Sequence, residues 1–341
     1  MIKLAVDAMG GDYAPEEIVN GVNLAIKNHE DLYINLYGDE EQIKKYLVPS
    51  ERVTVIHTPY FFDMGEKNSV LLSRHNKDYS LIKAFNAVRE KECQGAVTSG
   101  PTQCVIPMAQ LFVKRLPGMA KIALAPTLPA LNGKARMILD VGANVELKPE
   151  HIEQLALFAS TFMKEVRGIE NPKVGLINIG AEVGKGREQD KITYKLLEAN
   201  DKINFGGNIE PTIMLYSDCD IYINDGFSCN LVMKAIEGTA KAMGDELKKN
   251  IKSSLGGLIG ALFMKRNLKN FKNSMKADDV GGALIFGVDG VVVKAHGNSK
   301  AYAFSKAIDL AISGVQGGYV DIMRKHLEEN NAETNVSAIP E

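Results

Sequence analysis

Short apolar runs alternate with amphipathic segments along most of the 341-residue chain. The runs have the length of strands, whereas the segments at 15–27 and 151–166 repeat their apolar positions with the spacing of a helix. Strands are expected at 3–6, 32–37, 53–56, 95–97, 137–141, 174–179 and 221–223. This alternation is typical of a mostly parallel sheet covered on both faces, so it predicts a three-layer α/β/α fold.

The C-terminal part of the chain departs from this alternation. Residues 284–293 are expected to form a hairpin, because two apolar runs flank Asp289-Gly290, a pair favoured in tight turns. From residue 329 the chain becomes polar. We therefore expect one domain over residues 1–328 and a polar tail at 329–341.

Composition narrows the class of protein. With 45% hydrophobic residues the chain can bury a large core, and its formal net charge of −2 gives no general attraction for nucleic acid. The four cysteines and six histidines lack metal-binding spacing, so reduced thiols and no metal are expected. Because neither a signal-peptide core nor a bilayer-length apolar run is present, we expect a cytoplasmic protein that can still lie on a membrane surface.

Four segments share one pattern, an apolar run followed by small residues and an Asp or Asn. They are 4–12, 137–144, 175–186 and 220–230. In open parallel sheets, ligands bind beyond the carboxyl ends of the strands. We therefore expect the polar ends of these segments to meet at one rim of the sheet and form a single pocket.

Two glycine turns are candidates for binding an anion. The first follows Asp7 and contains Gly10 and Gly11, whose backbone N–H groups can approach an anion closely, although an ordinary strand-to-helix turn explains them equally well. The second contains Gly100 and Thr102 among several hydroxyls, and its alternative role is to cap the next helix. Neither turn matches the dinucleotide fingerprint, so nicotinamide binding is unsupported.

Three further groups carry candidate chemistry. Residues 175–186 run from a strand into a glycine-rich turn with Asn178, Glu182 and Lys185, which is a plausible anion site if Lys185 is more than a solvated surface lysine. Asn230 lies near an expected helix start, where it can cap the helix or contact a ligand. His57 follows a strand and is a minor candidate, because a lone histidine there is more often structural.

A basic amphipathic helix is expected within residues 247–275. Its apolar positions recur at helical spacing and are flanked by lysines and arginine, a pattern that favours an anionic membrane surface. Packing of the same face against the core or a second subunit is an equally good interpretation, and three glycines weaken the helix. The apolar positions are Leu255, Leu258, Ile259, Leu262 and Phe263.

Taken together and in this order, the segments resemble the bacterial phosphate acyltransferase family of phospholipid synthesis. The resemblance covers nearly the whole chain and rests on motifs at 7–15, 74–78, 139–144, 175–186, 225–230, 237–238 and 281–297. The second glycine turn departs from the family pattern, because Pro101 and Gln103 stand where an asparagine and a glycine are usual. Cys229 likewise replaces a glycine, while the neighbouring Asn230 is retained.

The resemblance implies a Rossmann-like fold similar to isopropylmalate dehydrogenase, with a projecting helical segment at about 247–275. It also implies a homodimer without metal, nicotinamide or another cofactor, and peripheral contact with an anionic membrane surface. The implied reaction transfers a fatty acyl group from acyl-acyl carrier protein to orthophosphate. The acyl phosphate would then pass to a membrane acyltransferase that acylates glycerol 3-phosphate.

Roles for individual residues follow from this resemblance. Lys185 is assigned to phosphate or oxyanion charge, and Asn230 and Asn178 are assigned to hydrogen bonding. The turns with Gly10, Gly11, Gly100 and Thr102 are assigned to phosphate. Supporting positions are Asp7, Asp140, Asn144, Glu182 and His57.

Three alternative functions remain open at this point. A phosphotransacylase using short-chain acyl-CoA would share the anion chemistry. A decarboxylating dehydrogenase of the same fold is weaker, because the sequence shows neither a cluster of metal-binding aspartates nor a nicotinamide motif. A catalytically inactive lipid-surface binding module is compatible with the altered turn at 98–104.

Overall fold

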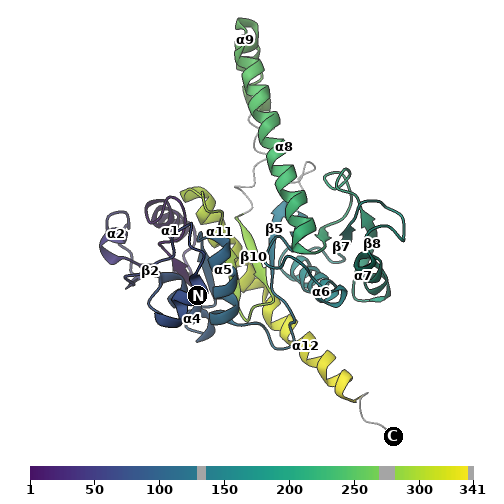
Figure 1. The fold of residues 1–341 in the computed structure, drawn as a ribbon. Coiled ribbons are helices and arrows are strands. Elements are labelled where there is room, and N and C mark those ends of the chain that lie inside the picture. The colour runs from purple at the N-terminus through teal and green to yellow at the C-terminus, as the bar shows by residue number, and fades with distance from the viewer. Residues whose placement is uncertain (129–135, 269–280, 337–341) are drawn as a thin grey trace.

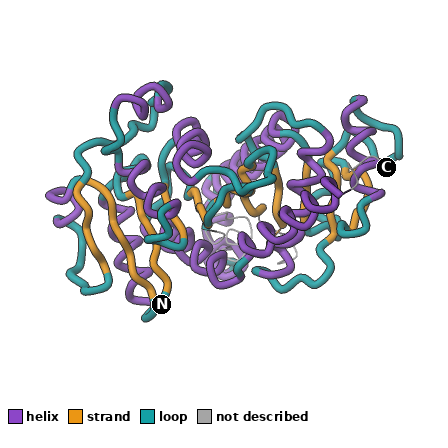
Figure 2. The backbone as a smooth tube through the Cα atoms, turned by 90° about the horizontal axis from the view of Figure 1, so that it is seen from below, coloured by secondary structure: helices purple, strands orange, loops and turns teal. Residues whose placement is uncertain are grey.

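A mixed eleven-stranded sheet forms the centre of the computed structural model, which describes residues 1–128, 136–268 and 281–336, with side chains described through residue 329. Helices lie on both sides of the strands, as the views from the side and from below show (Figures 1 and 2). The three-layer α/β/α fold predicted from the sequence is confirmed.

The first part of the chain builds one half of the sheet. Its elements are β1 (Ile2–Asp7), α1 (Glu16–Asn28), β2 (Leu32–Gly38), α2 (Glu40–Lys44), β3 (Val53–His57), α3 (Ser69–His75), α4 (Ser80–Arg89), β4 (Gly95–Thr98), α5 (Thr102–Met108) and the π-helical turn η1 (Ala109–Val113).

The rest of the chain builds the other half and then returns to the middle. Its elements are β5 (Ala123–Leu128), β6 (Arg136–Leu139), α6 (Pro149–Glu165), β7 (Lys173–Ile177), α7 (Glu188–Ala199), β8 (Asn204–Ile209), β9 (Ile221–Ile223), α8 (Gly226–Lys252), α9 (Leu255–Phe263), β10 (Ala283–Phe286), β11 (Val291–Lys294), α11 (Ala301–Gly317) and α12 (Tyr319–Val336).

The strand order of the sheet is β3-β2-β1-β4-β11-β10-β5-β6-β9-β7-β8. The strand directions divide this sheet into two parallel groups. Strands β3, β2, β1, β4 and β11 are mutually parallel, and so are β6, β9, β7 and β8. Three antiparallel pairings separate these groups, β11 with β10, β10 with β5, and β5 with β6. The two groups therefore run in opposite directions. The expectation that all four polar strand ends meet at one rim stays a prediction.

The late hairpin is confirmed, because β10 and β11 pair antiparallel on either side of Asp289-Gly290. It lies in the middle of the sheet, where β11 joins β4 and β10 joins β5. Helix α12 passes residue 328 and ends at Val336, so the expected tail begins inside a helix. Residues 337–341 lie outside the described part.

The apolar face of α1 that the sequence pattern predicts packs into the hydrophobic core. Its apolar positions Ile18, Val19 and Val22 are buried, and each such side chain contributes roughly 1.5–3 kcal/mol when fully removed from water. Gly21 allows α11 to come close, because a Cβ there would lie 3.0 Å from the Cβ of Phe304. This contact fixes α11 over the strands that carry the first glycine turn.

Helices α8 and α9 form a projecting arm (Figure 1). The five apolar positions expected on a helix within 247–275 lie on α9, and the segment is divided because α8 ends at Lys252 and α9 starts at Leu255. The Ser254 side chain accepts the Gly257 N–H at 3.0 Å and so caps the new helix. Residues 269–275 lie outside the described part. Within the described residues, no helix is long and apolar enough to cross a bilayer.

The five expected membrane-docking residues all lie on the exposed tip of this arm. Leu255 is 76% exposed and Phe263 is 87% exposed, and no residue of α9 is buried. The other three apolar side chains, Leu258, Ile259 and Leu262, are also exposed. Packing of this face against the protein's own core, one of the two interpretations of the sequence, is therefore excluded for this chain alone.

Candidate functional site

Asp7 joins the two predicted glycine turns at the carboxyl ends of β1 and β4. The Thr98 hydroxyl donates to the Asp7 carboxylate at 2.7 Å, and the Met9 N–H donates to the same carboxylate at 3.2 Å. The Gly100 N–H in turn donates to the Thr98 oxygen at 3.0 Å. Burial of the carboxyl raises the pKa of Asp7, although these hydrogen bonds act in the opposite direction.

The two turns touch backbone to backbone. A Cβ on Gly10 would lie 2.7 Å from the nitrogen of Gly100, so a side chain there would push the turns apart. Gly11 has a φ of +120° and faces Ser99, where a Cβ would lie 3.0 Å from the Ser99 Cβ. The structure thus brings together Gly10, Gly11 and Gly100, as expected. Thr102 begins α5 just beyond Pro101 and is partly exposed.

A third loop, which was assigned no role from sequence, completes this group. The Ala295 N–H donates to the Thr98 carbonyl at 2.8 Å, and the Asp12 N–H donates to the Gly297 carbonyl at 2.8 Å. The Ser99 hydroxyl donates to the His296 carbonyl. We name residues 7–12, 98–102 and 294–297 the glycine-turn cluster.

Two lysines carry positive charge near this cluster. Desolvation, assisted by the ammonium of Lys234, lowers the pKa of Lys294 to about 8, while Asp12 acts in the opposite direction. Desolvation and the Lys294 ammonium lower the pKa of His296. Lys234 belongs to α8 and ion-pairs with Glu237 at 2.9 Å. Helix α8 therefore passes beside the cluster, although it starts in the other half of the sheet.

Asn230 lies one helical turn before Lys234 on α8. Residues four apart share a face of a helix, so the Asn230 amide is on the side that carries Lys234. Asn230 also lies beneath the turn after β6, since a Cβ on Gly142 would be 3.3 Å from its amide nitrogen. Among the described residues, none hydrogen-bonds the Asn230 side chain, so its amide is available to a ligand.

The loop after β7 is shaped by Asn178. Its amide group donates to the Lys185 carbonyl and to the Asn208 side chain, each at 3.1 Å, and its oxygen accepts the Ile179 N–H at 2.8 Å. The Asn208 amide holds the Glu182 carbonyl at 2.8 Å. The Asn178 side chain thus orders the loop that carries Lys185, and this use occupies both ends of its amide.

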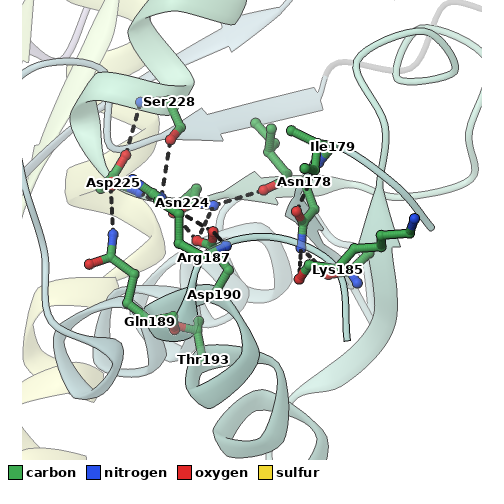
Figure 3. A network of polar contacts seen from close by, with 12 residues as sticks. Asn178, Ile179, Lys185, Arg187, Gln189, Asp190, Thr193, Asn224, Asp225 and Ser228 are labelled. Atoms are coloured by element: carbon green, nitrogen blue, oxygen red, sulfur yellow. Dashed lines mark hydrogen bonds and ion pairs between the residues drawn. The ribbon is translucent and has the colours of Figure 1, made fainter. Parts of the chain in front are cut away.

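Lys185 and Glu182 are exposed on this loop. The Lys185 ammonium points away from the neighbouring network of polar side chains (Figure 3). Both residues belong to the half of the sheet opposite the glycine-turn cluster, because their loop follows β7. The catalytic role of Lys185 therefore stays a prediction.

Arg187, which sequence reasoning missed, is the centre of that network (Figure 3). Its guanidinium binds Asp190 through two nitrogens, each at 2.9 Å, and Asp225 at 2.8 Å. Asp225 is fully buried and also accepts the Ser228 N–H at 2.9 Å, which caps the start of α8. Burial would raise the pKa of Asp190, but the Arg187 hydrogen bonds outweigh it and hold that pKa below its ordinary value.

Asp140 and Asn144 shape the turn against which α8 begins. The Asp140 carboxylate accepts the N–H groups of Leu124, Ala143 and Asn144 at 2.9, 3.1 and 2.7 Å. Burial raises the pKa of Asp140 despite these bonds. A Cβ on Gly226 would lie 1.9 Å from the Asn144 carbonyl oxygen, so only glycine fits there. Both residues support the position of α8.

His57 lies apart from these groups. It ends the edge strand β3, which β2 separates from β1, and its Nδ1 accepts the Glu40 N–H at 3.3 Å. This contact is at the start of α2, so it gives His57 a local structural role. Among the residues that the structure describes, no group of three or more His, Cys, Asp and Glu side chains could hold a metal ion.

Solved structures share this fold. A branched-chain phosphotransacylase from Enterococcus faecalis has a TM-score of 0.59 at 13% identity, covering 92% of this chain and 99% of that chain. A phosphotransacetylase from Streptococcus pyogenes has a TM-score of 0.57 at 14% identity, covering 93% and 94%. A 4-hydroxythreonine-4-phosphate dehydrogenase from Klebsiella pneumoniae has a TM-score of 0.55 at 12% identity, covering 92% and 99%. At these identities the likeness shows the fold alone.

Several relatives found by sequence have much higher identity to this chain than these solved structures do. A family described as fatty acid synthesis protein matches residues 2–321. The phosphate acyltransferase of Acholeplasma laidlawii is 49% identical over 90% of this chain and 93% of its own length. The phosphate acyltransferase of Staphylococcus aureus is 39% identical over 97% and 100%. Since the match extends over almost the whole length of the chain and of these relatives, the chain belongs to the phosphate acyltransferase family of fatty acid and phospholipid synthesis.

Proposed function

We propose that the chain transfers a fatty acyl group from acyl-acyl carrier protein to orthophosphate, and that the glycine-turn cluster holds the orthophosphate. The observation that carries this proposal is the contact between Gly10 and Gly100, which brings two backbone turns together at the carboxyl ends of β1 and β4, beside Lys294 at the end of β11. Backbone N–H groups at glycine turns are suitable donors for phosphate oxygens.

The chemistry needs no covalent acyl-enzyme. A phosphate oxygen attacks the thioester carbonyl carbon, a new C–O bond forms, and the tetrahedral oxyanion collapses as the C–S bond breaks and the carrier thiolate leaves. The protein contributes by holding phosphate against the carbonyl and by stabilising the oxyanion. Asn230 suits the oxyanion because its amide is free and lies on the α8 face that carries Lys234. Lys185 remains the candidate for charge stabilisation, and Asn178 positions its loop.

The exposed arm supports a membrane-associated role for the same enzyme. The apolar tip of α9 and the lysines on either side of it suit an anionic bilayer surface, where each nearby cation adds about 1 kcal/mol. We propose that this surface brings the acyl phosphate to a membrane acyltransferase that uses glycerol 3-phosphate. A homodimer whose second copy completes the acyl-chain groove is part of the same proposal, as is a catalytic domain spanning residues 1–328.

A turnover assay tests the donor. Palmitoyl-acyl carrier protein and palmitoyl-CoA are each incubated with the protein, with and without orthophosphate, and the released thiol is measured. We expect phosphate-dependent release from the carrier protein at the higher rate. Preference for a short-chain acyl-CoA would instead favour a phosphotransacylase. Vesicle binding without turnover of any donor would favour an inactive lipid-surface module.

A further inference from the structure

Lys294 occupies a distinctive place at the end of β11. Its Cα pairs with that of Thr98 across the two parallel strands, so the lysine lies beside the residue that anchors the second glycine turn. The next residue, Ala295, donates its N–H to the Thr98 carbonyl at 2.8 Å, which fixes the end of this strand against the turn. Lys294 is therefore held by the sheet itself rather than by a long loop.

The Lys294 ammonium is partly buried and donates to the Ala295 carbonyl at 3.1 Å. Among the residues that the structure describes, no carboxylate makes an ion-pair contact with it. Asp12 acts on it only as a more distant charge, while Lys234 opposes its protonation. A largely desolvated cation without a counter-ion costs free energy, and such groups concentrate at functional sites.

The two glycine turns of the cluster need such a cation if they hold phosphate. Residues 7–12 and 98–102 include no basic side chain, and the buried Asp7 carboxyl adds negative charge when ionised. Orthophosphate carries more than one negative charge near neutral pH, so neutral donors alone leave most of it uncompensated. Lys185 lies on the exposed loop after β7, a strand of the other parallel group, whereas Lys294 is held directly beside Thr98 by the strand register.

We propose that Lys294 is the principal cationic ligand of the orthophosphate bound by the glycine-turn cluster, with Lys234 of α8 as a second positive charge. The proposal rests on the phosphate site proposed above and assigns to that site a residue outside the loop of Lys185. Binding of the anion removes the repulsion between the two ammonium groups, so α8 and β11 are drawn to the same ligand.

Steady-state kinetics test this assignment. In Lys294→Met, we expect the KM for orthophosphate to rise roughly ten- to a hundredfold, the effect of losing one charge-assisted hydrogen bond, while the KM for the acyl donor changes little. Lys294→Arg keeps the charge and should recover part of the affinity. Lys164→Met removes an exposed lysine on α6 and is the matched control. An unchanged phosphate KM in Lys294→Met overturns the proposal.

The pH profile gives a readout that a purely structural role would not move. Because kcat/KM reports the free enzyme, kcat/KM for phosphate should fall as pH rises through about 8, where Lys294 loses its proton. Lys234→Met removes a neighbouring positive charge, so the fall in kcat/KM for phosphate should move to higher pH. Asp12 and His296 are the other titratable groups near Lys294, and Glu237 lies near His296. If kcat/KM for phosphate falls with rising pH in Lys294→Met as it does in the wild type, the proposal is contradicted.

Calorimetry with inorganic phosphate separates this proposal from the proposed reaction, because it needs no acyl donor. We expect the wild type and Lys164→Met to bind phosphate and Lys294→Met to bind it much more weakly.

Thermal unfolding of each variant shows whether it is folded. Replacing an unpaired, desolvated ammonium by methionine should leave the midpoint unchanged or raise it. Should Lys294→Met nevertheless fail to fold, the proposal is tested by the phosphate affinity of Lys294→Arg and by the shift of the pH profile in Lys234→Met. Equal phosphate binding by wild type and folded Lys294→Met overturns the assignment even if the acyl-transfer assay succeeds.

Discussion

Gly10 and Gly100 lie in direct contact, although they come from turns at the ends of two different strands. A Cβ on Gly10 would lie 2.7 Å from the Gly100 nitrogen and 2.9 Å from its Cα. Real Cβ atoms do not approach backbone this closely, so the pair of glycines sets the spacing of the two turns. The proposed phosphate site depends on that spacing.

Gly10→Ala should therefore impair catalysis more than folding. The methyl group forces the turns apart, and we expect kcat/KM for phosphate to fall roughly 10- to 100-fold at a stability cost of about 1–3 kcal/mol. Gly244→Ala is the matched control, because its Cβ meets nothing within 4 Å and the change favours the helix by about 0.5–1 kcal/mol. Full phosphate affinity in a folded Gly10→Ala would argue against the site.

Arg187→Met should loosen the start of α8. It leaves Asp225 buried without its cation, and we expect a loss of about 1–3 kcal/mol in the free energy of unfolding, limited because Arg187 is half-exposed. Urea unfolding at neutral pH measures this loss. Arg89→Met, at an exposed position of α4, is the control and should change little.

The same network makes a prediction about pH. The pKa of Asp190 in the folded protein is lowered below that of an ordinary aspartate, so its contribution to stability is fully present above the ordinary pKa. This contribution is lost as pH falls through the native pKa, when the carboxylate is protonated. The stability difference between wild type and Arg187→Met should accordingly shrink in acid, and a difference that stays constant down to the acid transition would contradict the account.

Lys185→Ala tests the exposed lysine on the loop after β7. If its ammonium reaches the oxyanion in the complete complex, kcat should fall on the order of 100-fold with little change in phosphate KM. Lys202→Ala, at another exposed lysine of the same half, serves for comparison. Near-normal turnover and phosphate KM in Lys185→Ala would remove Lys185 from the mechanism.

Leu258→Glu tests the tip of the arm. Losing one apolar side chain from a bilayer costs roughly 1.5–3 kcal/mol, so co-sedimentation with anionic vesicles should weaken about tenfold or more while activity without lipid is kept. Ile192→Glu places the same charge on an exposed apolar position of α7 and should not affect vesicle binding. Equal vesicle binding by Leu258→Glu and wild type would exclude this face as the docking element.

The sequence predicted the individual strands better than their arrangement. Strands such as β1 and β7 have continuous apolar runs, whereas β8, with two adjacent glycines and partly exposed residues, and β5, with Pro126, lack that pattern and were missed. The expected mostly parallel sheet is in fact mixed, because strand direction is set by the antiparallel pairings of β10 and β5 in the middle of the sheet. No local pattern encodes those pairings.

The site was predicted in the same partial way. Glycines that touch across two turns leave a signal in sequence, and so Gly10, Gly11 and Gly100 were found. Arg187 and Lys294 were missed because a paired or desolvated cation looks like a surface one until its neighbours are known. Asn178 was found, but its side chain is used to order a loop, which only the contacts with Asn208 and Lys185 reveal.

The measurement that tests the central claim most directly uses orthophosphate labelled with oxygen-18. The protein is incubated with palmitoyl-acyl carrier protein and labelled phosphate, and the products are analysed by mass spectrometry. Attack by a phosphate oxygen predicts palmitoyl phosphate that retains every labelled oxygen, formed together with free carrier thiol. Release of unlabelled palmitate at a rate independent of phosphate would contradict the account.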